Sequence, residues 1–476
     1  MPRRSISIKP NEYEFDFTRA SKIWASSQLG DLPSSETILF GDGFVNDDSI
    51  ARCLGQILDP LLADLVDVAL FVYFADRLSP RRRHTNPHHH FQWSRKIRLK
   101  IPVRRLEAWS NSETHESLRQ LLRYFTEDDW RIDFVPHQKE KRSSESQTLL
   151  FHSPLPEHTR VALFSGGLDS YAGAVQQIAE LPDYHFVLVS GVTNTRQGNG
   201  QREQVKVIKN VAPSRITHIA VSYGIRQGIE RSEEVSQRSR GFLFTALGAA
   251  TAIVAETREL YVYENGIGAI NLPYDGTQVG TSNTRAVHPI SLLRMSQFVS
   301  KLIQADFHIH NPFLFHTKAE MCSHPAVRRL GEGIAMTFSC DGFPIRKKDQ
   351  PQCGICTSCL LRRQSLESAG LSIFDDSSAY LNDLQSYITA RAKLRPLLAM
   401  EWQAQKIAAC LTAKDPWQKL AYEFPSLMEI ASEICLDTNT ESERVRSDLL
   451  RLYSQYVTEW NGFSARGLIS PQTPAD

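Results

Sequence analysis

The chain has 476 residues, of which 41% are hydrophobic and 22% are charged, a balance typical of globular proteins that excludes extended disorder. Its 54 lysines and arginines nearly cancel its 53 aspartates and glutamates, so no overall charge draws it to nucleic acid or to a membrane surface. The longest uncharged apolar stretch, residues 242–255, is too short to span a bilayer. No signal-peptide core is recognised at the start, and the few cysteines suit a reducing compartment, so we expect a cytoplasmic protein without a membrane partner.

Three blocks follow one another along the chain, in line with the roughly 150 residues of a typical domain. The first block, residues 1–150, has the pattern of an N-terminal accessory α+β domain that ends in a linker. Its apolar run at 57–74 is interrupted by aspartates at helical rather than strand spacing. The elements expected here are a strand at 5–9, a helix over 57–74, strands at 97–103 and 130–135, and a polar linker over 137–147.

The second block, residues 151–370, alternates predicted strands with predicted helices, an order typical of a parallel sheet covered by helices on both faces. The third block, residues 371–476, is expected to be helical, because apolar residues recur at helical spacing between Val445 and Tyr456. The fold class is therefore α/β, with an N-terminal α+β domain and a C-terminal helical region. In the second block we expect strands at 161–164, 186–192, 216–222 and 260–263, a helix from about 169, and a long helix over 241–256.

A glycine-rich turn follows the first strand of the second block. Residues 165–170 read Ser-Gly-Gly-Leu-Asp-Ser, and the chain has no Gly-Lys pair, so this is not a Walker A loop. Two glycines allow the backbone to approach a ligand closely, and the free amides and dipole of the following helix favour an anion. An aspartate there would repel phosphate unless it held a cation or capped the helix. The residues predicted to bind the phosphates of ATP are Ser165, Gly166, Gly167, Leu168, Asp169 and Ser170.

Four cysteines predict a metal site. Cys340 is followed after twelve residues by Cys353, Cys356 and Cys359, and four thiolates at this spacing can close a tetrahedral zinc site. Zinc is favoured over an iron–sulfur cluster, which stays open as an alternative, because no further cysteine of a ferredoxin-type run follows. Since four protein ligands leave no open coordination position, the expected role of the metal is structural.

The turn at 165–170 resembles the phosphate-binding loop of the PP-loop ATP pyrophosphatases. Combined with the cysteine pattern, it resembles the QueC family of 7-cyano-7-deazaguanine synthases. The resemblance covers residues 155–370 and implies a PP-loop (adenine nucleotide alpha hydrolase-like) parallel sheet with a zinc knuckle. Four further segments carry it: Arg240-Gly-Phe-Leu-Phe, Asn311 through Lys318-Ala319-Glu320, Thr337-Phe-Ser-Cys340, and Leu361-Arg362.

This resemblance implies an ATP-dependent reaction on a small molecule like 7-carboxy-7-deazaguanine. In the family, the carboxylate attacks the α-phosphorus of ATP, pyrophosphate leaves, ammonia gives the amide, and a second activation gives the nitrile. Catalytic roles are implied for Asp169, Arg240 and Lys318, with ATP, Mg²⁺ and Zn²⁺ as cofactors. Glu264 and Asp275 are candidates for the carboxylate that accepts the N–H groups of a guanine-like edge, with a helix-cap or turn role equally open.

The flanking blocks distinguish the chain from stand-alone synthases. About 150 residues precede the matching region and about 100 follow it. With these extensions the chain resembles the long QueC-like proteins of bacterial antiviral defence operons. The resemblance implies transfer of the activated carboxylate to an amine on a partner protein from the same operon. A 7-cyano-7-deazaguanine synthase that uses ammonia is the alternative.

Two further functions remain open. Residues 77–105 carry ten Lys/Arg, four His and no acid, so a tRNA-modifying PP-loop enzyme would hold RNA there, through Arg95, Arg98 and Lys100. A solvated strand face explains the same pattern, so nucleic acid is open as a partner but not favoured. The other function is a non-catalytic, nucleotide-sensing module, which would bind ATP without turnover.

Overall fold

The computed structural model describes twelve parts of the chain. The expected strand at 5–9, Asp275 and residues 82–93 of the basic segment at 77–105 lie outside them. Within the described ranges, no helix is long and apolar enough to cross a membrane. The described residues are 12–18, 43–81, 94–137, 143–146, 155–225, 234, 236, 238–274, 285–342, 352–382, 394–438 and 440–465.

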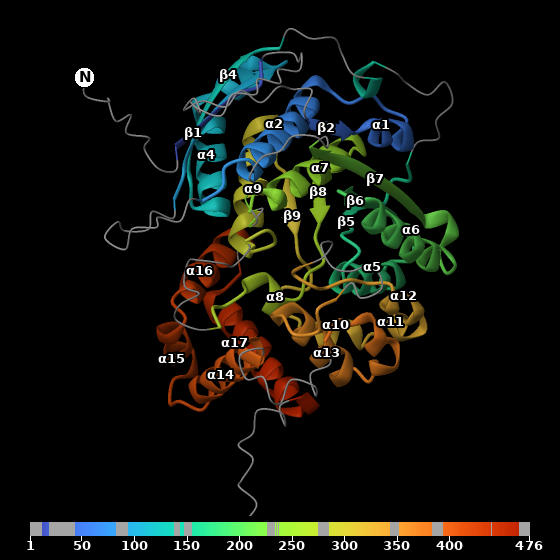
Figure 1. Ribbon diagram of the computed structural model, residues 1–476, viewed down its shortest axis with the longest axis vertical. Coiled ribbons are helices and arrows are strands. Elements are labelled where there is room, and N and C mark those ends of the chain that lie inside the picture. The colour runs from blue at the N-terminus through green and yellow to red at the C-terminus, as the bar shows by residue number, and fades with distance from the viewer. Residues whose placement is uncertain are drawn as a thin grey trace, which may run out of the picture.

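A six-stranded sheet forms the centre of the molecule (Figure 1), in the order β2-β7-β6-β5-β8-β9. Strands β5 to β9 run parallel to one another, and β2 adds an antiparallel edge to β7. The four strands expected in the second block are therefore confirmed, whereas β2 and β9 were not predicted. The bounds are β2 Gly43–Asn46, β5 Thr159–Leu163, β6 His185–Val192, β7 Ile216–Ile225, β8 Glu259–Tyr261 and β9 His308–His310.

Helices cover both faces of this sheet. The inward side chains of β5 alternate between two hydrophobic clusters, with Val161 and Leu163 in one and Ala162 in the other, as expected for a strand buried on both faces. Helices α5 (Leu168–Glu180) and α6 (Thr195–Lys209) lie on one face, and α7 (Arg240–Val254) and α9 (Pro289–Ile303) lie on the other. The long helix expected over 241–256 corresponds to α7.

The N-terminal residues form a second, three-stranded parallel sheet in the order β1-β3-β4. Helix α2 packs between this sheet and α7. Because both sides of the helix are covered, α2 carries apolar side chains all around its axis. Side chains from both sheets share one hydrophobic cluster. The elements are β1 Glu12–Asp16, α1 Asp48–Leu54, α2 Pro60–Arg77, β3 Lys96–Val103, α3 Leu106–Ser110, α4 Ser112–Thr126 and β4 Asp129–Pro136.

Part of the expected linker at 137–147 is packed rather than exposed. Residues 143–145 form a 3-10 helix in which Glu145 is 4% exposed. The carboxylate of Glu145 accepts two hydrogen bonds from Arg104, whose guanidinium also reaches Asp64 and Asp67 of α2. This ionic cluster holds the segment against the N-terminal block.

The basic residues in and just before β3 lie beside acidic residues in the fold. Arg95 is fully buried, and its guanidinium bonds to the carboxylates of Asp76 and Asp128 at 2.6 and 2.5 Å. The idea that Arg95 contacts RNA is therefore wrong, because its charge is needed inside the fold. The outward residues of β3 also have acidic neighbours across the sheet, in the rows Glu12–Lys96–Asp129, Glu14–Arg98–Arg131 and Asp16–Lys100–Asp133.

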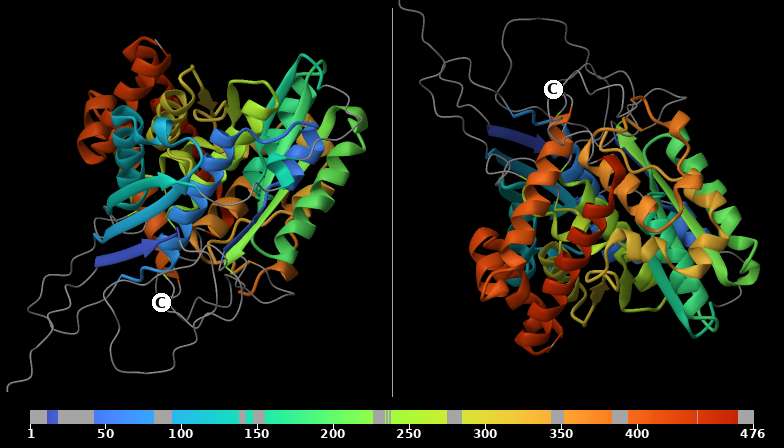
Figure 2. Two further views of the ribbon diagram at one scale, coloured as in Figure 1. Left: turned by 90° about the horizontal axis from the view of Figure 1, so that it is seen from above. Right: turned by 90° about the horizontal axis from the view of Figure 1, so that it is seen from below.

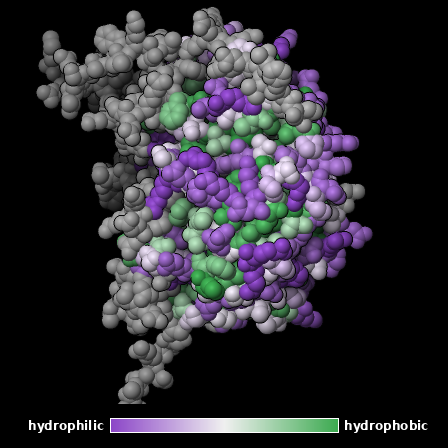
Figure 3. All heavy atoms as spheres, turned by 90° about the vertical axis from the view of Figure 1, so that its right-hand side faces the viewer, coloured by the Kyte–Doolittle hydropathy of each residue, from purple (hydrophilic) through white to green (hydrophobic). Residues whose placement is uncertain are grey.

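The C-terminal block is helical, as expected, and lies beside α8 and α13 (Figures 1 and 2). Helix α17 packs on α14 and α13 and buries the predicted stripe from Val445 to Tyr456. On the side of the molecule that carries α6, hydrophilic side chains separate the hydrophobic ones (Figure 3). The elements are α8 Gly266–Ile270, α10 Lys318–Cys322, α11 Pro325–Arg329, α12 Glu332–Ala335, α13 Thr357–Ser368, α14 Arg395–Leu411, α15 Pro416–Glu423, α16 Ser426–Thr438 and α17 Ser442–Gly462.

Candidate functional site

The glycine-rich turn joins β5 to α5 at the carboxyl edge of the central sheet. Gly166 has a φ of +82°, a left-handed conformation that favours glycine. The hydroxyl of Ser165 lies 3.1 Å from that of Ser170 and accepts a hydrogen bond from the amide of Gly167 at 3.2 Å. Among the described residues, no side chain caps the start of α5. The turn therefore presents serine hydroxyls at a positively polarised helix end, an arrangement suited to an anion.

Two glutamines of α6 hold the carbonyl groups of this turn. The side-chain amide of Gln201 donates to the Ser165 carbonyl, and that of Gln204 donates to the Gly166 carbonyl, both at 3.0 Å. Both glutamines are almost fully buried, and among the described residues their Oε1 atoms have no hydrogen-bond partner. These two hydrogen bonds to the carbonyls of Ser165 and Gly166 hold the backbone of the turn against α6.

Beside the turn, Asp169 forms a buried ion pair with Lys318. The Nζ atom of Lys318 lies 2.5 Å from Oδ2 of Asp169, and the two residues are 6% and 8% exposed. The amide of Asn265 donates to Asp169 Oδ1 at 2.9 Å and to Glu264 Oε1 at 3.0 Å. Asp169 therefore does not cap α5, and the cation that compensates its charge here is Lys318.

Electrostatics couple the ionisable groups of this cluster. Burial and the neighbouring charge of Asp169 raise the pKa of Glu264 to about 8, although Lys318 and Asn265 oppose the rise. Burial lowers the pKa of Lys318, but the carboxylates of Asp169 and Glu264 outweigh burial and raise it overall. Lys318 is therefore an ammonium ion at neutral pH, where Glu264 is mostly protonated.

The sheet topology explains why distant segments meet here. Strands β5, β8 and β9 are neighbours and parallel, so the segments after their carboxyl ends share one edge, the usual ligand site in such sheets. Asp169 follows β5, Glu264 follows β8, and Lys318 follows β9. Asn311 ties the last two segments, because its side-chain amide donates to the Glu264 carbonyl at 2.8 Å.

The other proposed catalytic residue, Arg240, stands apart. It begins α7, and its side chain is exposed. Among the described residues, no hydrogen bond or ion pair joins it to the turn or to Lys318. Its neighbour Ser239 is anchored by Asp76, which accepts hydrogen bonds from the Ser239 amide and hydroxyl at 2.9 and 2.6 Å.

A pocket of about 460 Å³ lies away from the turn, along α4 and the start of α9. Three arginines line it, but Arg285 is paired with Glu127 at 3.1 Å, and Glu127 also binds Arg238. We place the candidate site at the turn instead, because the anion-binding helix start and the buried Asp169–Lys318 pair lie together there. The pocket is lined by Gln120, Arg123, Tyr124, Glu127, Arg285 and Arg294.

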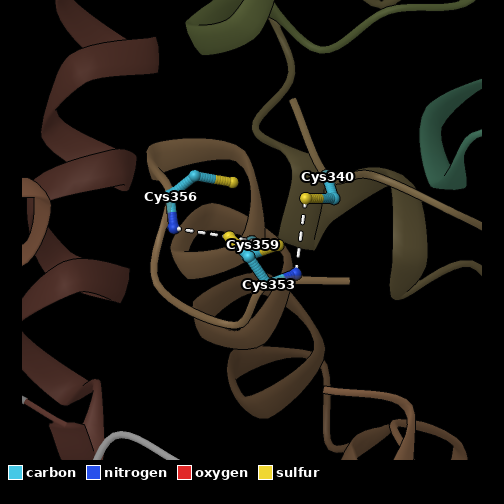
Figure 4. A group of neighbouring side chains, drawn as sticks. All are labelled: Cys340, Cys353, Cys356 and Cys359. Carbon is cyan, nitrogen blue, oxygen red and sulfur yellow. Dashed lines mark hydrogen bonds between the residues drawn. The ribbon is translucent and has the colours of Figure 1, made fainter. Parts of the chain in front are cut away.

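The four cysteines form a compact cluster (Figure 4). The sulfur atoms of Cys340, Cys353, Cys356 and Cys359 all lie within 4.8 Å of one another. Tetrahedral zinc with Zn–S bonds of about 2.3 Å places its sulfur ligands about 3.8 Å apart, and the sulfurs of Cys353 and Cys359 are 3.9 Å apart. Backbone amides donate to the sulfurs of Cys340 and Cys353 at 3.3 and 3.2 Å, which stabilises thiolates. The donor set fits zinc.

These features together are typical of a PP-loop α/β protein with a four-cysteine cluster. The model of the family described as queuosine biosynthesis protein QueC matches residues 284–370. The chain is 26% identical over 245 residues to the 7-cyano-7-deazaguanine synthase of Cupriavidus pinatubonensis, and the match covers 47% of this chain and 97% of that protein. The synthase of Hydrogenovibrio crunogenus is 26% identical over 250 residues, which cover 47% of this chain and 96% of that protein. The chain is therefore a QueC-like protein.

Proposed function

We propose that the protein uses ATP to activate the carboxylate of 7-carboxy-7-deazaguanine. The observation that carries this proposal is the buried Asp169–Lys318 pair beside the glycine-rich turn. A carboxylate oxygen of the substrate attacks the α-phosphorus of ATP, the bond between the α- and β-phosphates breaks, and pyrophosphate leaves. The products of this step are an acyl adenylate and pyrophosphate.

Each group beside the turn has a role in this step. The serine hydroxyls and the amides of residues 165–170 bind the leaving pyrophosphate. Lys318 neutralises charge on the phosphates or on the substrate carboxylate. Asp169 holds Lys318 in place and would be the carboxylate that holds the Mg²⁺ ion accompanying ATP. Arg240 was predicted for the same charge neutralisation, and because its exposed side chain has no contact with this cluster among the described residues, its role stays a prediction.

We propose that the acyl group of the adenylate is transferred to an amine of a partner protein encoded in the same operon. The amine nitrogen attacks the carbonyl carbon, AMP leaves, the nitrogen loses a proton, and an amide bond forms. The resemblance to long, defence-associated QueC-like proteins supports this acceptor and an antiviral role. Two similar proteins are named 7-cyano-7-deazaguanine synthase, so ammonia is the second candidate acceptor.

The four-cysteine cluster has a structural role in this proposal. Zinc bound by Cys340, Cys353, Cys356 and Cys359 fixes the start of α13, which contains Cys359. Buried Arg362 of the same helix donates to the Thr337 hydroxyl at 2.5 Å and to the Ile334 carbonyl at 3.0 Å. The metal thereby supports the chain between α12 and Cys340, which lies next to the turn through the hydrogen bond from the Phe338 amide to the Gly166 carbonyl.

The test is a reaction of purified protein with ATP, Mg²⁺ and 7-carboxy-7-deazaguanine, with and without co-purified partner. We expect AMP and pyrophosphate, and a mass shift on the partner that equals the deazaguanine acyl group. A nitrile product formed with ammonia supports the second acceptor. Binding of ATP without turnover under all of these conditions contradicts the proposal and supports a nucleotide-sensing module.

A further inference from the structure

We propose that the C-terminal helix α17 positions Lys318 and that Glu459 is the positioning residue through which it acts. This inference rests on the proposed function for the role of Lys318 in the reaction. It assigns a task to the C-terminal block, which lies outside the region matched by the family model. The geometry that carries it consists of three separate attachments between α17 and the segments that hold the active-site cluster.

The first attachment is a buried hydrogen bond to the start of α10. The hydroxyl of Thr317 donates to Oε1 of Glu459 at 2.6 Å, and the two residues are 1% and 8% exposed. Thr317 is the N-cap of α10, and Lys318 is the first residue of that helix. Glu459 therefore fixes the residue that immediately precedes Lys318.

The second attachment lies two turns earlier on α17. The guanidinium of Arg451 donates to Glu320 at 2.6 Å and also to the carbonyl of Phe315. Glu320 closes the capping box of α10, because its carboxylate accepts from the Thr317 amide at 2.8 Å. Arg451 thus holds the same cap from its exposed side.

The third attachment is apolar and reaches the segment after β8. Leu452 of α17 lies so close to Gly266 that a β-carbon there would come within 2.6 Å of the leucine side chain. The Gly266 amide donates to the carbonyl of His316 at 2.8 Å. Helix α17 therefore supports both segments that bring Asn265 and Lys318 to Asp169.

External support matters because α10 has only five residues, and a helix this short is not stable by itself. A displacement of about 1 Å in a catalytic group can lower a rate by about 100-fold. Glu459 also accepts hydrogen bonds from Gln455 and Gln364 at 3.0 and 3.3 Å. These two hydrogen bonds hold the Glu459 carboxylate in the orientation in which it accepts from Thr317.

The chain offers a matched control in Glu401. This glutamate is 9% exposed and accepts hydrogen bonds from the indole of Trp460 and the amide of Gln405, both at 2.7 Å. Glu401 and Glu459 belong to the same C-terminal bundle and are similarly buried, and the two donors named for Glu401, Gln405 of α14 and Trp460 of α17, belong to that bundle. A loss of bundle stability alone would affect both variants equally.

The experiment compares E459M, E459Q and E401M of the full-length protein. Hydrogen exchange is measured at the amides of residues 317–322, and AMP formation is measured with ATP, Mg²⁺ and 7-carboxy-7-deazaguanine. For E459M we expect faster exchange in this segment and a kcat lowered by about 10- to 100-fold. E459Q keeps an acceptor oxygen and should stay within about threefold of the wild type, and E401M should leave exchange in this segment unchanged.

The same exchange and the same rate in E459M and E401M would overturn the inference. If E459M does not fold, T317V removes the donor instead and T317S restores it, and equal behaviour of these two variants would also overturn it. If the wild-type protein forms no AMP, the proposed function fails, but hydrogen exchange still decides whether α17 positions the Lys318 segment.

Discussion

The Nζ atom of Lys318 lies 2.5 Å from Oδ2 of Asp169, although 149 residues separate the two along the chain. Both side chains are almost fully buried, so each charge depends on the other for compensation. The pair stands at the start of α5, next to a turn built for an anion. This juxtaposition links the fold to the proposed activation of a carboxylate.

Replacement of either partner should abolish activity. We expect K318M and D169N to lower the rate of AMP formation by at least about 100-fold, because the phosphates lose a fixed cation or that cation loses its partner. K419M is the matched control, since Lys419 forms an exposed ion pair with Glu423 at 2.8 Å. A D169N variant that keeps wild-type turnover would contradict the role of the pair.

The glutamines behind the turn should control nucleotide binding. In Q204L, the Gly166 and Met336 carbonyls lose a donor at 3.0 Å, so we expect the turn to relax and the Kd for ATP to rise by about tenfold or more. The control Q176L alters a partly exposed helix position whose side-chain amide donates to Glu180. Nucleotide titration by calorimetry checks both variants, and equal affinities would show that the turn does not need Gln204.

Metal removal should destabilise the chain around α13. We expect about one zinc per chain by elemental analysis and a loss of several °C in Tm after chelation. C356S should reproduce that loss. C410S should keep its zinc, because Cys410 belongs to the hydrophobic cluster of the C-terminal block and is not one of the four clustered cysteines. Iron with the absorbance of an iron–sulfur cluster would contradict the zinc assignment.

Stability should depend on pH through Glu264. Burial and the charge of Asp169 raise its pKa from an ordinary 4.5 to about 8, so the folded protein holds this proton more tightly than the unfolded chain does. The resulting stability is present below pH 4.5 and is lost as pH rises through 8. The Tm of the wild type minus that of E264Q, measured without ATP and Mg²⁺, should therefore fall between pH 5 and 9. A difference that stays constant or grows would refute this protonation state.

Removal of the buried charge of Arg95 should lower the free energy of unfolding. R95M leaves Asp76 and Asp128 buried without the cation that both contact, and such a loss typically costs about 3–5 kcal/mol. The exposed pair of Arg119 and Glu116 provides the control R119M, for which about 0–1 kcal/mol is expected. Urea denaturation measures both values, and a loss of stability for R95M no larger than that for R119M would contradict the role of the buried ion pairs.

Local patterns allowed the turn and the cysteine cluster to be predicted from the sequence. The strand, glycines and helix start of residues 161–170 are contiguous, and three of the four cysteines lie within seven residues. The meeting of Lys318 with Asp169 was expected only through the family resemblance, because it depends on the neighbouring positions of β5 and β9 in the sheet.

Other features depend on contacts that no local pattern shows. Gln201 and Gln204 were not predicted, although their spacing of three places them on one side of α6. The side-chain amide of Asn265 donates to the carboxylates of Asp169 and Glu264, which come from different segments. The burial of Arg95 was missed because a basic run resembles a binding surface when its acidic partners, Asp76 and Asp128, are not known to lie beside it.

The nucleotide products of the reaction test the central claim most directly. Purified protein is incubated with ATP labelled at the α- and γ-phosphates, Mg²⁺ and 7-carboxy-7-deazaguanine, and the labelled products are separated. The account predicts AMP and pyrophosphate in the wild type, dependent on the carboxylate substrate and absent in K318M. Release of ADP and inorganic phosphate, with no AMP, would contradict it.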